Sequence, residues 1–169
     1  MTTPAPKPAS ELTLRSYVPE DFETLFEIDQ ACYEPEIAYS RRELRNYLRF
    51  PGADCVVARI ASAIVGFCIT ASRAGGYIIT IDVLEQHRRA RVGTALLHEV
   101  ESRMAAAGVR EVRLETATNN HSAIAFWNRH GYRTLSVWKH YYPGGRDAYV
   151  MSKQLGPPAP NETQKRQAT

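Results

Sequence analysis

The sequence has few cysteines, no long apolar run and little net charge. Its three cysteines are odd in number and show no C-x-x-C spacing, which speaks against a disulfide framework and against a zinc site. No stretch reaches the roughly 18 apolar residues that a membrane span needs, and residues 1–10 carry no apolar signal-peptide core. We therefore expect a cytoplasmic protein. A net charge of +3 is too small for a general nucleic-acid or membrane binder.

The 169 residues suffice for one domain with a sizeable core. Proline-rich, polar stretches at 1–10 and 156–169 predict disordered tails, which leaves residues 11–155 for the domain. Hydrophobic periodicity predicts the order β-α-α-β-β-β-α-β-α-β-β, an α/β (α+β) arrangement with a mixed, mostly antiparallel sheet of about seven strands and helices on both faces. The predicted strands are residues 12–17, 54–60, 63–72, 77–84, 109–116, 132–142 and 147–155, and the predicted helices are 20–33, 40–48, 92–107 and 120–130.

Basic side chains gather on one turn, HRRARVG, between the strand at 77–84 and the helix at 92–107. The first turn of a helix has unpaired N–H groups and a dipole that favours negative charge, and arginine adds donors suited to phosphate. Gly93 would let a ligand approach the backbone, and Thr94 would offer a hydroxyl. These features predict an anion site, with a solvated basic turn as the alternative. Neither the nucleotide P-loop pattern nor G-x-G-x-x-G is present.

This turn resembles the acetyl-CoA-binding signature of the GNAT N-acetyltransferases, Q/R-x-x-G-x-G/A. Within IDVLEQHRRARVGTALL, Arg88 takes the first position, Gly93 takes the last, and Arg91 stands where the first glycine is expected. A glycine there lets the loop wrap a pyrophosphate without a Cβ. Either this turn tolerates a side chain, or coenzyme affinity is reduced.

Two further stretches resemble the same family. RLETATNNHSAIAFWNRHGYRTL is similar to its N-x-x-A-x-x-F/L-Y/W-x-x-x-G-F/Y segment, with Asn120, Ala123, Phe126, Gly131 and Tyr132 in place. WKHYYPGGRDAYVMSKQL is similar to the tyrosine-pair hairpin of the protein N-terminal acetyltransferases, which include the RimI-type ribosomal-protein alanine acetyltransferases.

The resemblance implies a GNAT fold and an enzyme that moves the acetyl group of acetyl-CoA to a primary amine. The implied amine is the N-terminal α-amine of a protein, a ribosomal protein among the candidates. No metal and no specific nucleic acid are implied, and the chain would be a monomer or homodimer. The coenzyme would lie against Ile81, Val83, Arg88, Arg89, Arg91, Val92, Gly93, Thr94, Asn120 and Trp127. Asn120 would also cap its helix, because asparagine is a favoured N-cap residue.

Acetyl transfer needs a base, an oxyanion donor and a fixed geometry. By resemblance Glu115 is the candidate base, because it lies five residues before Asn120, where the resembled subgroup carries a glutamate or a histidine. Its neighbours on the predicted strand point to the opposite face, so Glu115 has a different environment. The alternative makes Glu115 one charge in an exposed alternation with Glu111 and Arg113. By resemblance, the backbone N–H of Val83 is the oxyanion donor.

The leaving thiolate needs a proton, and this chain has Trp127 where the family carries a tyrosine. An indole N–H cannot deliver a proton at neutral pH. Tyr141 or Tyr142 would then take over, with Tyr142 as our candidate, or water would act, or the thiolate would leave unassisted. Trp127 would alternatively only pack against the pantetheine arm.

An α-amine suits a single glutamate base better than lysine does, because its reference pKa of about 7.7–8.0 lies well below the value of about 10.4 for lysine. Tyr141 and Tyr142 would lie on either side of a peptide backbone and hydrogen-bond its first carbonyl. Tyr33 would line the other side of this peptide site. Each tyrosine is alternatively an ordinary packing aromatic.

Three rival functions stay open. Acetylation of a small amine or of lysine is one, because ACYEPEIAYSRREL does not closely match the RimI pattern. A non-catalytic acyl-CoA sensor is another, suggested by Arg91 and Trp127. Nucleic-acid binding by the arginine turn is the third, although the sequence has no helix-turn-helix pattern.

Overall fold

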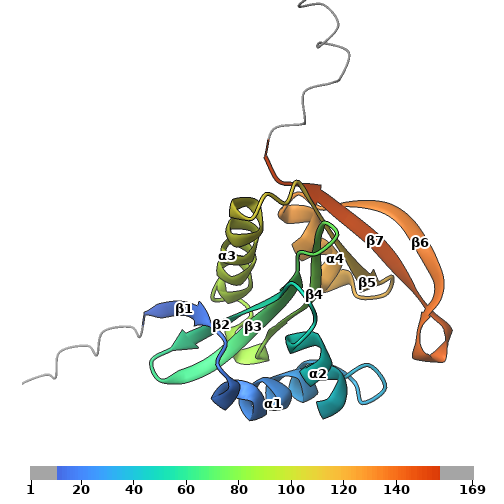
Figure 1. Ribbon diagram of the computed structural model, residues 1–169. Helices are drawn as coiled ribbons and strands as arrows, with labels where there is room; N and C mark the ends of the chain where they lie inside the picture. Colours follow the sequence, from blue (N-terminus) through green and yellow to red (C-terminus); the bar gives the residue numbers. More distant parts are fainter. Residues whose placement is uncertain (1–10, 157–169) are drawn as a thin grey trace, which may run out of the picture.

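A seven-stranded sheet forms the centre of the computed structural model, which describes residues 11–156 (Figure 1). Its spatial order is β1-β2-β3-β4-β5-β7-β6, and every neighbouring pair is antiparallel except β4 and β5. The predicted mixed, mostly antiparallel sheet is therefore confirmed. The tails predicted at 1–10 and 156–169 lie outside the described residues, apart from Gly156. The strands are β1 (Leu12–Ser16), β2 (Ala53–Ile60), β3 (Ala63–Ala71), β4 (Gly76–Val83), β5 (Glu111–Ala117), β6 (Arg133–Tyr142) and β7 (Arg146–Gln154).

Four helices cover the two faces of the sheet, as predicted (Figure 1). They are α1 (Phe22–Cys32), α2 (Arg41–Leu48), α3 (Val92–Ala106) and α4 (His121–Arg129). One core cluster joins α1 and α2 to one face, and a larger cluster joins α3 and α4 to the other. α1 starts two residues later than predicted, because Pro19–Asp21 form a 3-10 turn. No helix of the described residues is long and apolar enough to cross a membrane.

A β-bulge reverses the side-chain alternation of β4. Ile69 pairs with Thr80 and Thr70 pairs with Ile78, so Ile79 is the extra residue. Ile78 packs in the core on the α3 face, whereas Ile79 packs against the cluster of α1 and α2. The second half of β4 consequently presents Thr80 and Asp82 to α1.

β4 and β5 separate soon after they meet. Their only pairs are Gly76 with Val112 and Tyr77 with Arg113, near the start of β4. Beyond these pairs β5 runs beside β7 alone. A gap therefore opens between the carboxyl halves of two adjacent parallel strands, where α/β proteins commonly bind ligands.

Candidate active site

The predicted anion site lies at the N-terminus of α3. The first intrahelical hydrogen bond runs from Ala95 N–H to the Arg91 carbonyl at 3.0 Å, so the three preceding N–H groups have no partner within the helix. Arg91 caps this end with a φ of 60°, in the left-handed region that favours glycine. The turn therefore tolerates a side chain where the family pattern places glycine. Arg88, Arg89 and Arg91 are all exposed around it.

Several residues of this turn already have partners inside the fold. Arg88 Nε donates to the Val83 carbonyl at 2.9 Å, and the Thr94 hydroxyl lies 3.1 Å from His130 Nε2. A Cβ on Gly93 would lie 3.3 Å from the Phe126 ring, so glycine here lets α3 approach α4. The smallness of Gly93 therefore serves packing between helices, which sequence spacing did not indicate. Val92 is fully buried and Ile81 packs against the same core.

Val83 directs its N–H into the gap between β4 and β5. Leu84 N–H donates to the Val65 carbonyl at 3.0 Å, which makes Leu84 and Val65 a hydrogen-bonded pair of antiparallel strands. Hydrogen-bonded and non-hydrogen-bonded pairs alternate along such strands, so Val83, opposite Gly66, points its N–H away from β3. This orientation is the one that an oxyanion donor at Val83 requires.

Asn120 and Trp127 take structural positions on α4. The Asn120 side chain accepts a hydrogen bond from Ala123 N–H at 3.1 Å, so the predicted N-cap is confirmed. Trp127 is 5% exposed and lies edge-on to Phe126 and Tyr132, with ring centroids 5.0 and 5.2 Å apart. The indole is thus part of the core, and packing accounts for its ring.

Glu115 differs from the other charged residues of β5. Glu111 and Arg113 form an ion pair at 3.2 Å, whereas Glu115 is half-buried and has no side-chain partner among the described residues. Burial raises the pKa of Glu115 from 4.5 to about 7. Its strand neighbours Leu114 and Thr116 are buried on the opposite face, as predicted. A carboxyl group poised near neutral pH has the property of a general base.

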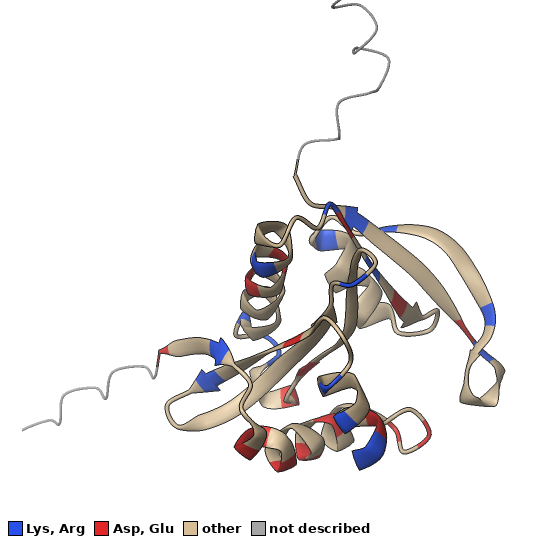
Figure 2. Ribbon diagram, in the orientation of Figure 1, with Lys and Arg blue, Asp and Glu red and all other residues tan. Residues whose placement is uncertain are grey.

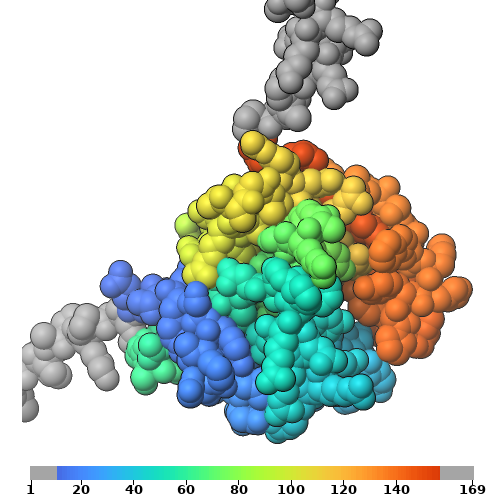
Figure 3. All heavy atoms as spheres, in the orientation of Figure 1, coloured from blue at the N-terminus to red at the C-terminus, as the bar shows by residue number. Residues whose placement is uncertain are grey.

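The tyrosine pair faces the segment between α1 and α2. Tyr141 and Tyr142 lie edge-on, 4.9 Å between ring centroids, at the end of β6. Burial is the main cause that raises the pKa of each hydroxyl above 10, and the Glu115 carboxylate contributes to both shifts. Both rings line a cavity of about 670 Å³, with the segment 35–40 on its other side. In the space-filling view the β6–β7 hairpin (orange) lies next to this segment (cyan) (Figure 3).

Tyr33 is half-buried and is not among the residues that line this cavity. It follows the last residue of α1, and its hydroxyl lies 3.3 Å from the Thr80 hydroxyl on β4. Sequence reasoning missed Tyr77, which pairs with Arg113 and lies on the same face of the sheet as Glu115. It also missed Tyr39, which lines the cavity beside Tyr141. The available signal for Tyr77 was a lone tyrosine at the start of an otherwise largely apolar central strand.

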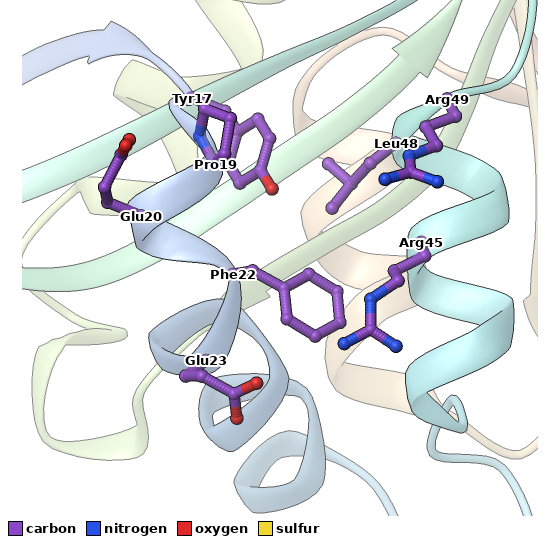
Figure 4. A pocket seen from close by; sticks show the side chains of 8 residues that line it. All are labelled: Tyr17, Pro19, Glu20, Phe22, Glu23, Arg45, Leu48 and Arg49. Carbon is purple, nitrogen blue, oxygen red and sulfur yellow. The ribbon is translucent and has the colours of Figure 1, made fainter.

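A second cavity, of about 560 Å³, lies away from these residues (Figure 4). Phe22 and Arg45 face each other across it, with the guanidinium 4.4 Å from the ring centroid. Acidic residues along α1 face basic residues on α2, including the ion pair of Glu23 with Arg41 (Figure 2). These contacts join the two helices, and none of the predicted site residues lies there.

The sequence matches the acetyltransferase (GNAT) family over residues 22–132, from α1 to the end of α4. The chain belongs to the GNAT family. This GNAT domain is 38% identical over 81 residues to the N-alpha-acetyltransferase of Sulfurisphaera tokodaii, a match covering 47% of this chain and 48% of that protein. The chain thus spans about half the length of that relative. It is 26% identical over 159 residues to the N-alpha-acetyltransferase of Saccharolobus solfataricus, covering 86% and 94% of the two chains.

Solved structures show the same fold for this GNAT domain. Ard1 from Thermoplasma volcanium is 27% identical with a TM-score of 0.79, covering 86% of this chain and 99% of that one. The ribosomal-protein-S18-alanine N-acetyltransferase from Escherichia coli gives a TM-score of 0.81 at 21% identity, covering 89% and 98%. The predicted GNAT fold is therefore confirmed.

Proposed function

We propose that this GNAT domain transfers the acetyl group of acetyl-CoA to the N-terminal α-amine of a peptide or protein. The observation that carries the proposal is the half-buried Glu115, whose pKa burial raises to about 7, on the side of the sheet where Tyr141 and Tyr142 line a cavity. Two relatives named N-alpha-acetyltransferase, from Sulfurisphaera tokodaii and Saccharolobus solfataricus, support the same assignment. A ribosomal-protein terminus is one acceptor of this kind.

A base with a pKa of about 7 suits an α-amine. At about pH 7.5 roughly a quarter to a third of α-amines are neutral, against about one lysine in a thousand. Glu115 therefore needs only to accept the proton that a neutral amine loses as its bond to the acetyl carbon forms. A lysine acceptor would first have to lose a proton that a carboxylate of this pKa accepts poorly.

The residues at the start of α3 fit the coenzyme. Three N–H groups without intrahelical partners and three exposed arginines form a cradle suited to phosphates. Bound there, acetyl-CoA supplies an acetyl group activated as a thioester. Val83 N–H would donate to the thioester carbonyl oxygen. Tyr142 is the proposed proton donor to the thiolate, because its hydroxyl is protonated at neutral pH and its ring lines the cavity on the Glu115 side of the sheet.

The test is thiol release from acetyl-CoA with two matched peptides at about pH 7.5. One peptide has a free N-terminus and no lysine, and the other has a blocked N-terminus and one lysine. We expect turnover of the first peptide alone, and loss of that turnover in Glu115→Gln. Turnover of the lysine peptide, or of neither peptide while acetyl-CoA still binds, would refute N-terminal acetylation of this peptide.

A further inference from the structure

Two buried aspartates have no role in the chemistry proposed above. Asp29 on α1 is fully buried and Asp82 on β4 is 1% exposed. Although they lie far apart in the sequence, their carboxyl groups approach each other closely enough to interact in the interior of the fold. Two ionised carboxylates in such contact, without a buried cation between them, would repel strongly.

The hydrogen bonds of the pair leave one oxygen on each carboxyl group unpaired. Asp82 Oδ1 accepts from the Thr80 hydroxyl at 2.6 Å. Asp29 Oδ2 accepts from Tyr39 N–H at 2.8 Å and from Gln30 Nε2 at 3.1 Å. Within residues 11–156, the buried side-chain polar atoms without a partner are Asp29 Oδ1 and Asp82 Oδ2. One proton held between the two carboxyl groups would give both of these oxygens a hydrogen bond.

The pair connects the central strand β4 to the segment between α1 and α2. Through Asp29 it holds the backbone of Tyr39, whose carbonyl also accepts from Gln30 Nε2 at 2.8 Å. Through Thr80 it reaches the hydroxyl of Tyr33. Both tyrosines belong to the segment 33–40 between α1 and α2, and residues 35–40 of this segment line the cavity opposite the tyrosine pair.

We propose that Asp29 and Asp82 share one proton, and that this shared proton holds the segment 33–40 in the shape that binds the N-terminal residue of the acceptor. This inference rests on the proposed function, because the segment lines the proposed acceptor site. Asp29 and Asp82 are positioning residues here, since neither reaches the reacting atoms.

The arrangement makes acceptor binding sensitive to alkaline pH. Burial is the main cause that raises the pKa of both carboxyl groups. Other titratable or charged groups surround the pair: Cys32, Tyr33 and Tyr39 from α1 and the segment after it, Glu43 from α2, Cys55 from β2, Cys68 from β3, and Arg88 from the turn after β4. Once the shared proton is lost, two carboxylates face each other and the segment loosens, so KM for the acceptor rises while kcat does not fall.

Asp82→Asn is the informative variant. Its amide group would donate to Asp29 where the shared proton now lies, and its oxygen would still accept from Thr80. We expect KM for a free-terminus peptide to rise several-fold between about pH 7 and pH 9 in the natural protein and to stay level in Asp82→Asn. Asp82→Ala, which restores no donor, should raise KM at every pH. Asp54→Asn, at an exposed carboxylate on β2, is the matched control and should follow the natural protein.

Carbon-13 NMR of the aspartate carboxyl groups tests the shared proton without any turnover. In the natural protein we expect one carboxyl group of the pair to stay protonated near pH 7, and in Asp82→Asn the remaining Asp29 to be ionised. Two ionised carboxylates in the natural protein near pH 7, or identical KM profiles in the natural protein and Asp82→Asn, would overturn the proposal. Failure to acetylate any free-terminus peptide would instead refute the proposed function, and the NMR titration would still decide whether the proton is shared.

Discussion

Replacing Glu115 by glutamine removes the candidate base and keeps the shape of the side chain. With a pKa of about 7, Glu115 is ionised in about half of the molecules at pH 7 and in about a tenth at pH 6. The amine must also lose a proton before it attacks. Well below pH 7, kcat/KM of the natural protein should therefore rise about a hundredfold per pH unit, and that of Glu115→Gln about tenfold.

The same substitution should lower kcat above pH 7 by about 10²–10⁴-fold, the usual contribution of a general base. Thiol release with a lysine-free peptide, followed from about pH 5.5 to pH 9, measures both effects. Glu111→Gln is the matched control, because Glu111 lies on the same strand and is already paired with Arg113. A pH slope that Glu115→Gln leaves unchanged would refute the role of Glu115, even if kcat fell.

Stability should respond to three further substitutions. Arg91→Gly removes the strain of a side chain at a left-handed backbone position. It should raise the free energy of unfolding by up to about 1 kcal/mol, which corresponds to about 2–4 °C in Tm. A lower Tm would show that the arginine side chain stabilises the turn. Asn120→Ala removes the hydrogen bond to Ala123 N–H and should lower the free energy of unfolding by about 1 kcal/mol in denaturant titration, whereas no change would mean that the cap is dispensable. Tyr132→Phe removes the buried hydrogen bond of 2.9 Å from the Tyr132 hydroxyl to Glu101 and should lower the free energy of unfolding by about 1–3 kcal/mol in the same titration. Peptide turnover should stay unchanged, and a parallel fall in turnover would contradict a purely structural role.

Local patterns predicted the elements well, because each depends on neighbouring residues. Ser40 and Glu43 form the reciprocal cap that their spacing indicates, at 2.8 and 3.2 Å. The four-residue recurrence from Val92 to Met104 lies buried along α3. Gly108 adopts a φ of 87° just beyond that helix, as a C-terminal stop requires.

Contacts between distant segments were not predictable in the same way. The bulge at Ile79 depends on pairing with β3, and without it the alternation assigns Thr80 and Asp82 to the wrong face. The spacing predicted Gly93 as a ligand contact, and its packing against the Phe126 ring depends on a residue from a distant helix. The family pattern placed Trp127 near the thiolate. Its contact with the Tyr132 ring depends on how α4 packs on the sheet, which the local pattern does not give.

The bulge also explains how one strand faces both the proposed coenzyme site and the proposed acceptor site. Before the bulge, the apolar side chain of Ile78 packs in the core under α3. After the bulge, Asp82 faces α1, and the N–H of Val83 points into the gap beside β5. The carbonyl of Val83 accepts from Cys32 Sγ at 3.4 Å and from Arg88 Nε at 2.9 Å, so α1 and the coenzyme turn meet at one peptide group. A substitution in α1 that moves Cys32 should therefore disturb Val83, the proposed oxyanion donor, and also the adjacent Tyr33 at the start of the segment 33–40.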